Sequence, residues 1–186
     1  MSKKKLTVAI SGQPASGKTT YAKFIAHKYN LRYVSSGQLF REYAREKGLS
    51  LLELHKLAEK DPSIDREIDR RALEEAKKGG VVIEGHLAAW IVKDFADVRI
   101  FFKAPLQVRS RRLAERDRKT LEEAAREILF RERSNKERAK KYYSIDLDDW
   151  SIFDLIIDTS FLNIEDIKTV LIVFMERFIR RKISRG

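Results

Sequence analysis

The chain has 186 residues, 43% of them hydrophobic, which is enough for one domain with a substantial core. It contains no cysteine, so disulfide bonds and cysteine-based zinc sites are excluded. The formal net charge of +11 suits a partner rich in negative charge, such as nucleotide phosphates, nucleic acid or an anionic membrane.

A short apolar strand, predicted at residues 6–10, leads into a glycine-rich loop and then a helical pattern at residues 20–29. The loop sequence GQPASGKT fits G-x-x-x-x-G-K-[ST] at every position. Strand, loop and helix in this order form a phosphate-binding loop, because backbone N–H groups and the helix N-terminus attract an anion. We expect Lys18 to reach the β- and γ-phosphates of a nucleotide and the Thr19 hydroxyl to ligate Mg²⁺. The predicted ATP-binding residues are Gly12, Gln13, Pro14, Ala15, Ser16, Gly17, Lys18, Thr19 and Thr20.

A second strand is predicted at residues 31–34, and a helix follows it directly. Arg41 lies about one turn into this helix, on the same side as Gly37. A guanidinium group at this place can hold a phosphate in a bidentate fork. The alternative is an ordinary arginine on the surface of a helix.

Residues 36–78 contain no strand pattern and predict three helices inserted between two strands. Ser36 is the expected cap of the first helix, which ends near Gly48. Ser50 and Glu53 form a capping box at the start of the second helix. The third helix opens at Asp61, which precedes a proline, and ends at the glycine pair 79–80.

The third strand, predicted at residues 81–83, is followed by Glu84, Gly85 and His86. Glu84 lies at the end of a buried strand beside a phosphate loop, where a carboxylate can orient Mg²⁺-bound water. The alternative is that Glu84 forms an ion pair with a basic neighbour. Gly85 permits close approach of backbone or ligand. His86 either contacts a phosphate or base, or is a hydrogen-bonded histidine in a turn.

Two more buried strands are predicted at residues 98–102 and 153–157, with helical patterns between all five strands. This alternation predicts an α/β fold of three layers, in which a five-stranded parallel sheet is flanked by helices. Ligands of such sheets bind at the carboxyl ends of the strands, where the phosphate loop and Glu84 lie.

Residues 106–143 are almost continuously helical, with a break near residues 117–120 where Thr120 and Glu123 can cap a new helix. Phosphoryl transfer builds negative charge on the moving group, and arginines from a mobile lid can stabilise that charge. We expect a few arginines of this segment to do so and the others to lie on solvated helix faces. The arginines concerned are Arg109, Arg111, Arg112, Arg116, Arg118, Arg126, Arg131, Arg133 and Arg138.

Taken together, these motifs resemble those of the nucleoside monophosphate kinases, and most closely those of archaeal-type cytidylate kinases. The matching stretches are ISGQPASGKTT, VSSGQLFRE, EKDPSIDREIDRR, VVIEGHLAAW and YYSIDLDDWSIFDLIIDTS, in family order over residues 10–160. The resemblance implies transfer of the γ-phosphoryl group of ATP to CMP, and also to dCMP, with Mg²⁺ as the cofactor. It implies that Arg112, Arg131 and Arg138 act with Lys18 as catalytic residues. The expected CMP-binding residues are Ser36, Gly37, Arg41, Asp61, Asp65, Arg66, Gly85 and His86.

The resemblance also implies a division of the single domain into a core, a monophosphate-binding insert and a lid. The core comprises residues 1–35, 81–118 and 144–186, the insert residues 36–80, and the lid about residues 119–143. One position departs from the family, which commonly has arginine where this chain has His86. Either Arg41 and another arginine hold the acceptor phosphate, or the bound dianion protonates His86.

Two other functions stay open. The first is a kinase of the same kind with another acceptor, such as AMP, UMP or a small hydroxyl compound. The second is a P-loop ATPase associated with RNA or the ribosome, which the positive charge motivates; the sequence contains no aromatic–basic RNA motif, so no specific nucleic acid partner is expected. No apolar run is long enough for a membrane span or a signal peptide, so we expect a cytoplasmic monomer that makes no membrane contact.

Overall fold

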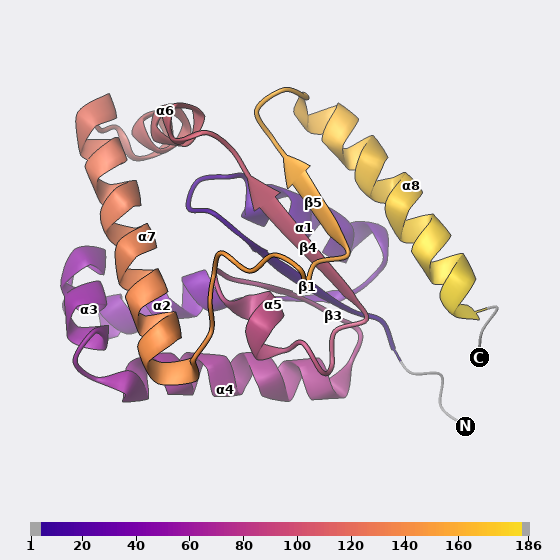
Figure 1. The fold of residues 1–186 in the computed structure, drawn as a ribbon, viewed down its shortest axis with the longest axis horizontal. Coiled ribbons are helices and arrows are strands. Elements are labelled where there is room, and N and C mark those ends of the chain that lie inside the picture. The colour runs from indigo at the N-terminus through magenta and orange to yellow at the C-terminus, as the bar shows by residue number, and fades with distance from the viewer. Residues whose placement is uncertain (1–4, 184–186) are drawn as a thin grey trace.

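The computed structural model describes residues 5–183, which form a five-stranded parallel sheet between layers of helices (Figure 1). The strand order is β2-β3-β1-β4-β5, and every neighbouring pair is parallel. The predicted α/β class and the five parallel strands are confirmed. In chain order the elements are β1 (Thr7–Gly12), α1 (Lys18–Lys28), β2 (Arg32–Ser35), α2 (Ser36–Glu46), α3 (Leu51–Ala58), α4 (Pro62–Lys78), β3 (Val81–Glu84), α5 (Ala88–Ile91), β4 (Val98–Lys103), α6 (Leu106–Asp117), α7 (Leu121–Tyr143), β5 (Leu155–Asp158) and α8 (Ile164–Ile183).

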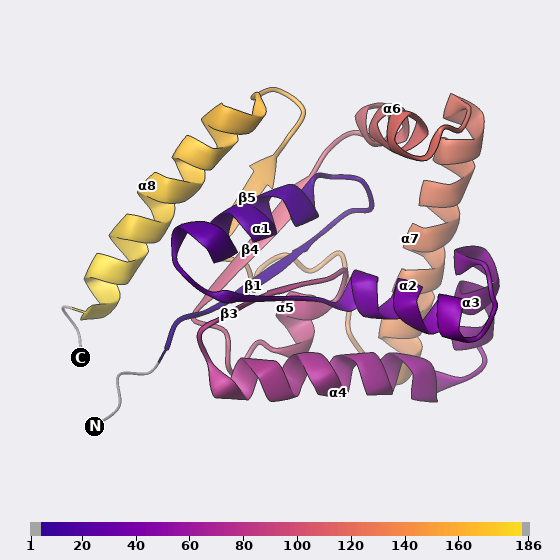
Figure 2. The same ribbon diagram turned by 180° about the vertical axis from the view of Figure 1, so that it is seen from behind.

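The central strand β1 is buried at all six positions, because helices cover both faces of the sheet. Val8 and Ile10 pack in one cluster with residues of α1 and α8, the helices that cover that side of the sheet in Figure 2. Ala9, between them, faces the other side and packs with α4 and α5. Strands buried on both faces have continuous apolar sequences, and this is the pattern that predicted them.

Helices α2, α3 and α4 form the inserted segment and have a small apolar core of their own. The capping boxes at Ser50 and Thr120 and the cap at Asp61 are confirmed. The cap of α2 is Ser35 rather than the predicted Ser36, because the Ser35 hydroxyl accepts the N–H of Gln38 at 3.2 Å. Ser35 ends β2 with extended backbone angles, which an N-cap requires, whereas Ser36 is already helical.

The long helix α7 stands at the edge of the molecule and contacts both α6 and the inserted helices α2–α4 (Figure 1). Near its start it packs against α6 through Leu113, Ala124 and Ile128. Towards its end, the Tyr142 hydroxyl donates to the main-chain oxygens of α3 and of the residue that follows it. Of the described helices, none combines the length and the apolar character needed to cross a membrane.

Candidate active site

The loop between β1 and α1 takes its shape from close main-chain contacts. Gly12 has a φ of 150°, and a Cβ atom on it would lie 2.1 Å from the carbonyl oxygen of Phe102. The N–H of Gln13 donates to that same oxygen at 3.1 Å, and its side-chain oxygen accepts the N–H of Ala104 at 3.0 Å. Gly17, with a φ of 90°, leads into α1. The predicted strand, loop and helix are therefore present, with the N-terminus of α1 at the loop.

Lys18 is the first residue of α1, and its ammonium group bends back over the loop. Its Nζ atom donates to the main-chain oxygen of Gln13 at 2.8 Å. Burial lowers the pKa of Lys18 to about 8, an effect that the nearby Glu84 carboxylate opposes and the Arg131 charge reinforces. An anion in the loop would favour the charged form of this lysine, as expected of a phosphate-binding residue.

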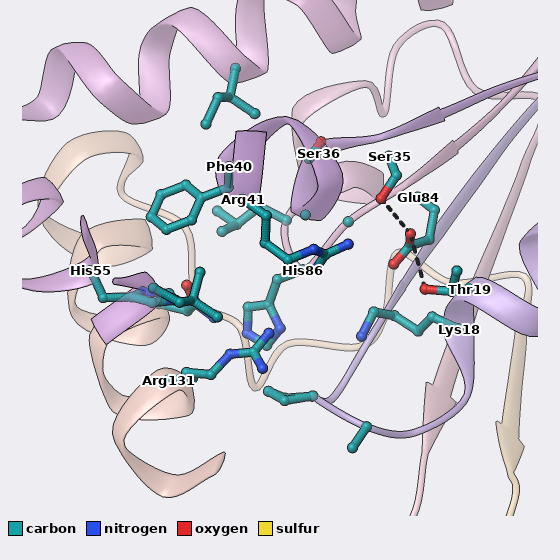
Figure 3. A pocket seen from close by; sticks show the side chains of 18 of the residues that line it. Lys18, Thr19, Ser35, Ser36, Phe40, Arg41, His55, Glu84, His86 and Arg131 are labelled. Atoms are coloured by element: carbon teal, nitrogen blue, oxygen red, sulfur yellow. Dashed lines mark hydrogen bonds between the residues drawn. The ribbon is translucent and has the colours of Figure 1, made fainter. Parts of the chain in front are cut away.

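Glu84 ends β3, and its buried carboxylate collects three hydroxyl donors. Its Oε2 atom accepts from Ser35 at 2.8 Å and from Thr19 at 3.4 Å (Figure 3). The same atom also accepts from the Tyr33 hydroxyl at 3.1 Å. Burial, together with the Glu84 charge, raises the pKa of Tyr33 to about 12, so its hydroxyl stays a donor.

Thr19 and Glu84 present only oxygen atoms, which suit a hard cation such as Mg²⁺. Among the described residues, no group of three or more His, Asp or Glu side chains could hold a metal ion by itself. Mg²⁺ commonly keeps several waters and binds through one or two protein oxygens together with substrate phosphates. The residues at this corner therefore fit a Mg²⁺ ion that arrives with a nucleotide.

Arg41 lies across the cavity from Lys18, on the first turns of α2 (Figure 3). A Cβ atom on Gly37 would lie 3.6 Å from Arg41 Nη1, so the guanidinium group folds back over the start of the helix. No hydrogen bond or ion pair found among the described residues involves Arg41. Gly85 is required here, because its Cβ would lie 2.8 Å from the Cβ of Ser36.

His86 is held against the phosphate loop and faces the same cavity. Its Nδ1 atom lies 3.1 Å from the carbonyl oxygen of Gly12, which can only accept, so we assign the proton to Nδ1. Burial, together with the charges of Lys18 and Arg131, lowers the pKa of His86 to about 3. A neutral His86 offers no positive charge, which favours Arg41 and a second arginine as the holders of an acceptor phosphate.

Arg131 of α7 and Arg112 of α6 both line the cavity. Arg131 pairs with Glu127 at 3.5 Å, while its Nε atom is buried without a hydrogen-bond partner among the described residues. Burial lowers the pKa of Arg131. Arg112 donates to the hydroxyl and the main-chain oxygen of Thr159, at 2.8 Å and 2.6 Å. Arg131 therefore has fewer hydrogen bonds to the described residues than Arg112 and is freer to contact a ligand in the cavity.

Arg138 is almost fully buried, and protein groups take both ends of its guanidinium fork. Nη1 pairs with the carboxylate of Asp65, and Nη2 donates to Asn135 Oδ1 at 2.6 Å and to His55 Nδ1 at 3.1 Å. The guanidinium also lies over the ring of Phe40. The catalytic role of Arg138 stays a prediction, and in this arrangement the side chain joins α7 to α3 and α4.

Arg109, another arginine of the predicted series, supports the phosphate loop from behind. It is 4% exposed, and its Nε atom donates to the main-chain oxygen of Ala104 at 2.8 Å. Its Nη1 atom donates to the Pro14 carbonyl at 3.3 Å and pairs with Glu132 of α7 at 2.8 Å. Arg109 therefore connects the loop to α7 and is not among the residues that line the cavity.

One cavity of about 490 Å³ joins these features. The volume lies in the range typical of sites for small ligands. The predicted residues that line it are Pro14, Ala15, Gly17, Lys18, Thr19, Thr20, Ser36, Gly37, Arg41, Asp65, Glu84, Gly85, His86, Arg112, Arg131 and Arg138.

Two residues expected at the CMP site lie outside this lining. Asp61 caps α4 by accepting the N–H of Ser63 at 2.9 Å, and both Asp61 and Arg66 are exposed. Conversely, His55, Asp69 and Asn135 line the cavity but were not predicted. The spacing of Asp65 and Asp69 was a usable signal, because residues four apart share a helix face. His55 and Asn135 come from other helices, and no local pattern marks them.

A second, open pocket lies on the other side of the phosphate loop. It has a volume of about 730 Å³ and is lined by Gly17, Thr20, Tyr21 and Arg112, together with residues 162–165 at the junction of the preceding loop and α8. Sequence reasoning missed this pocket, since the loop before α8 is far from the phosphate loop along the chain. The pocket has room for a group attached to phosphates that the loop would hold.

The fold and the site define a phosphotransferase of the P-loop class. The model of the cytidylate kinase-like family matches residues 7–161, and the chain belongs to that family. It is 50% identical over 175 residues to a cytidylate kinase of Staphylothermus marinus, covering 94% of this chain and 99% of the relative. It is 53% identical over 157 residues to a cytidylate kinase of Aeropyrum pernix, covering 84% and 91%. The predicted resemblance is thus confirmed.

Solved structures support the fold alone. A shikimate kinase from Bacteroides thetaiotaomicron superposes with a TM-score of 0.62 at 16% sequence identity, covering 92% of this chain and 98% of that one. An uncharacterised protein from Eubacterium ventriosum gives a TM-score of 0.71 at 20% identity, covering 92% and 99%.

Proposed function

We propose that this protein transfers the γ-phosphoryl group of ATP to CMP, and also to dCMP, giving ADP and the diphosphate. The observation that carries the proposal is one cavity that joins a complete phosphate loop to a free cation, Arg41, and then to a polar pocket between α3, α4 and α7. Family membership and relatives named cytidylate kinase at about half identity support the same activity.

On the donor side, the N–H groups of the loop and the Lys18 ammonium hold the β- and γ-phosphates. The Thr19 hydroxyl and, through water, Glu84 would hold Mg²⁺, which would supply positive charge to the transferred group. The donor base lies in the open pocket beside Tyr21 and Arg112, where the loop leaves room for it.

On the acceptor side, Arg41 and Arg131 hold the phosphate of CMP, with the neutral His86 between them (Figure 3). The attacking oxygen is already anionic, so no side chain has to remove a proton. The contribution of the protein is to place that oxygen in line with the γ-phosphorus and to stabilise the charge that develops. Helix α7 covers the site, and it excludes water that would otherwise hydrolyse ATP.

The test is ADP formation from ATP and Mg²⁺ with CMP, dCMP, UMP, AMP, GMP or no acceptor. The expected result is ADP, with the matching diphosphate in equal amount, in the presence of CMP or dCMP. Equal ADP formation with and without an acceptor would contradict the proposal, because it would identify a hydrolase. A preference for AMP would keep the enzyme class and refute the acceptor.

A further inference from the structure

Two carboxylates that the reaction does not use face the end of the cavity remote from Lys18. Asp65 and Asp69 lie one turn apart on α4, and both line the cavity. One oxygen of Asp65 pairs with Arg138, and the other, Oδ2, is buried without a hydrogen-bond partner in the described structure. One oxygen of Asp69 accepts the Tyr143 hydroxyl at 2.6 Å, and no described residue donates to the other. Each carboxylate therefore keeps one free acceptor.

The free acceptor of Asp65 is costly while it stays unpaired, because it is buried. Burial raises the pKa of Asp65, although Arg138 opposes the rise. Burial also raises the pKa of Asp69, to about 7, and the Asp65 charge adds to the effect while Tyr143 opposes it. A buried acceptor without a donor loses the hydrogen bonds that water gave it, so a ligand N–H group that reaches this place is strongly favoured.

The position of this pair fixes which part of the acceptor it meets. Figure 3 shows Phe40 and His55 together at the end of the cavity away from Lys18, and their rings are 4.8 Å apart. Arg138 connects His55 to Asp65, so the carboxylates belong to the same end. An acceptor nucleotide must place its phosphate near Lys18, and its base, at the other end of the molecule, then lies against α4.

We infer that Asp65, with Asp69 beside it, accepts hydrogen bonds from the exocyclic amine of the acceptor base and so selects a 4-amino-pyrimidine over a 4-oxo-pyrimidine. The inference rests on the proposed function, and it names the residues that set base specificity. The amine of cytosine donates two N–H bonds, one for each free oxygen. The O4 atom of uracil donates none and would place its lone pairs against the Asp65 carboxylate, leaving both acceptors unpaired.

The test is the ratio of kcat/KM for CMP to that for UMP in the Asp65→Asn variant. An amide at position 65 can still offer its oxygen to Arg138, so the free Oδ2 becomes an NH₂ group. That group repels the cytosine amine and can donate to the O4 atom of uracil. We expect the CMP to UMP ratio to fall by about 10- to 100-fold, with UMP unchanged or improved. A loss of CMP and UMP activity by the same factor, with the ratio unchanged, would overturn the inference.

Glu74→Gln is the matched control, since it removes a carboxylate from the exposed side of the same helix, where Glu74 pairs with Arg70. We expect this variant to keep the wild-type ratio. Asp69→Asn should also lower the ratio, because it removes the second of the two free acceptors.

A second measurement needs no variant and stays informative if Asp65→Asn fails to fold. It compares CMP with the monophosphate of the pyrimidin-2-one riboside, which carries hydrogen at position 4, on the wild-type protein. We expect kcat/KM to fall by about 10- to 100-fold when the amine is absent. Equal values for the two acceptors would overturn the inference while the proposed kinase activity stands. If CMP itself yields no ADP with wild-type protein, the proposed function has failed instead.

Discussion

Replacing Arg109 by alanine separates a structural arginine from a catalytic one. The side chain is 4% exposed and joins Pro14 and Ala104 to Glu132 of α7. Breaking a buried ion pair by removing one partner costs about 3–5 kcal/mol. Because the Glu132 side chain keeps 26% of its surface exposed, water can rescue part of its charge, and we expect a loss of about 2–3 kcal/mol. The measurement is urea unfolding at constant m-value.

The activity of the same variant completes the test. We expect kcat, measured where the variant is still folded, to fall by about 10-fold, because the phosphate loop loses a support but keeps Lys18. A transition-state arginine would instead cost about 10³–10⁵ in rate. Arg111→Ala is the control on the exposed side of α6 and should change stability by less than about 0.5 kcal/mol. Unchanged stability of Arg109→Ala with a loss above about 10³ in kcat would refute the structural assignment.

Arg41→Ala should lower kcat/KM for CMP by about 10- to 100-fold. Its stability should stay unchanged, since Arg41 is exposed and has no ion pair among the described residues. Arg45→Ala is the control, and an intact KM for CMP in Arg41→Ala would contradict the role of Arg41. Lys18→Ala should abolish transfer while calorimetry still detects CMP binding, and loss of CMP binding by a folded variant would count against this division of roles. Because the pKa of His55 is about 3 in the folded protein and 6.5 otherwise, the free energy of unfolding should fall as pH drops below about 6.5. His55 contributes a slope of about 1.4 kcal/mol per pH unit to the pH dependence of the free energy of unfolding. The His55→Gln variant should have a flatter slope, measured by urea titrations at several pH values. An unchanged slope would exclude His55 as the cause.

Local patterns predicted the parts of the fold that local physics determines. The phosphate loop was located from eight consecutive residues, and the helix caps at Ser50, Asp61 and Thr120 from one or two residues each. The error at Ser36 has the same origin, since two adjacent serines both suit a cap and only the path of β2 decides between them. In α8, the apolar residues Ile164 and Val170 are 52% and 40% exposed, because the sheet covers only part of that helix.

The roles of the arginines depend on partners that are distant in the sequence, and no local pattern specifies them. Arg112 meets Thr159, which is 47 residues away, and Arg138 meets Asp65, which is 73 residues away. Composition could show that α6 and α7 are rich in arginine, but only tertiary packing decides which side chains reach the cavity. His55 was missed for the same reason, since it becomes part of the site through Arg138.

Helix α7 works as a stiff rod with one attachment at each end of the substrate cleft. Its 23 residues span roughly 34 Å. Near its start the helix packs on α6 through Ala124 and Ile128, and at its middle Glu132 is tied through Arg109 to the phosphate loop. Near its end Arg138 and Tyr142 are tied to the inserted helices. A rod fixed in this way cannot swing away from the ATP side without pulling α3 and α4 along or breaking these bonds. Opening for either nucleotide is then a shared motion, so the affinity for one substrate depends on whether the other is bound.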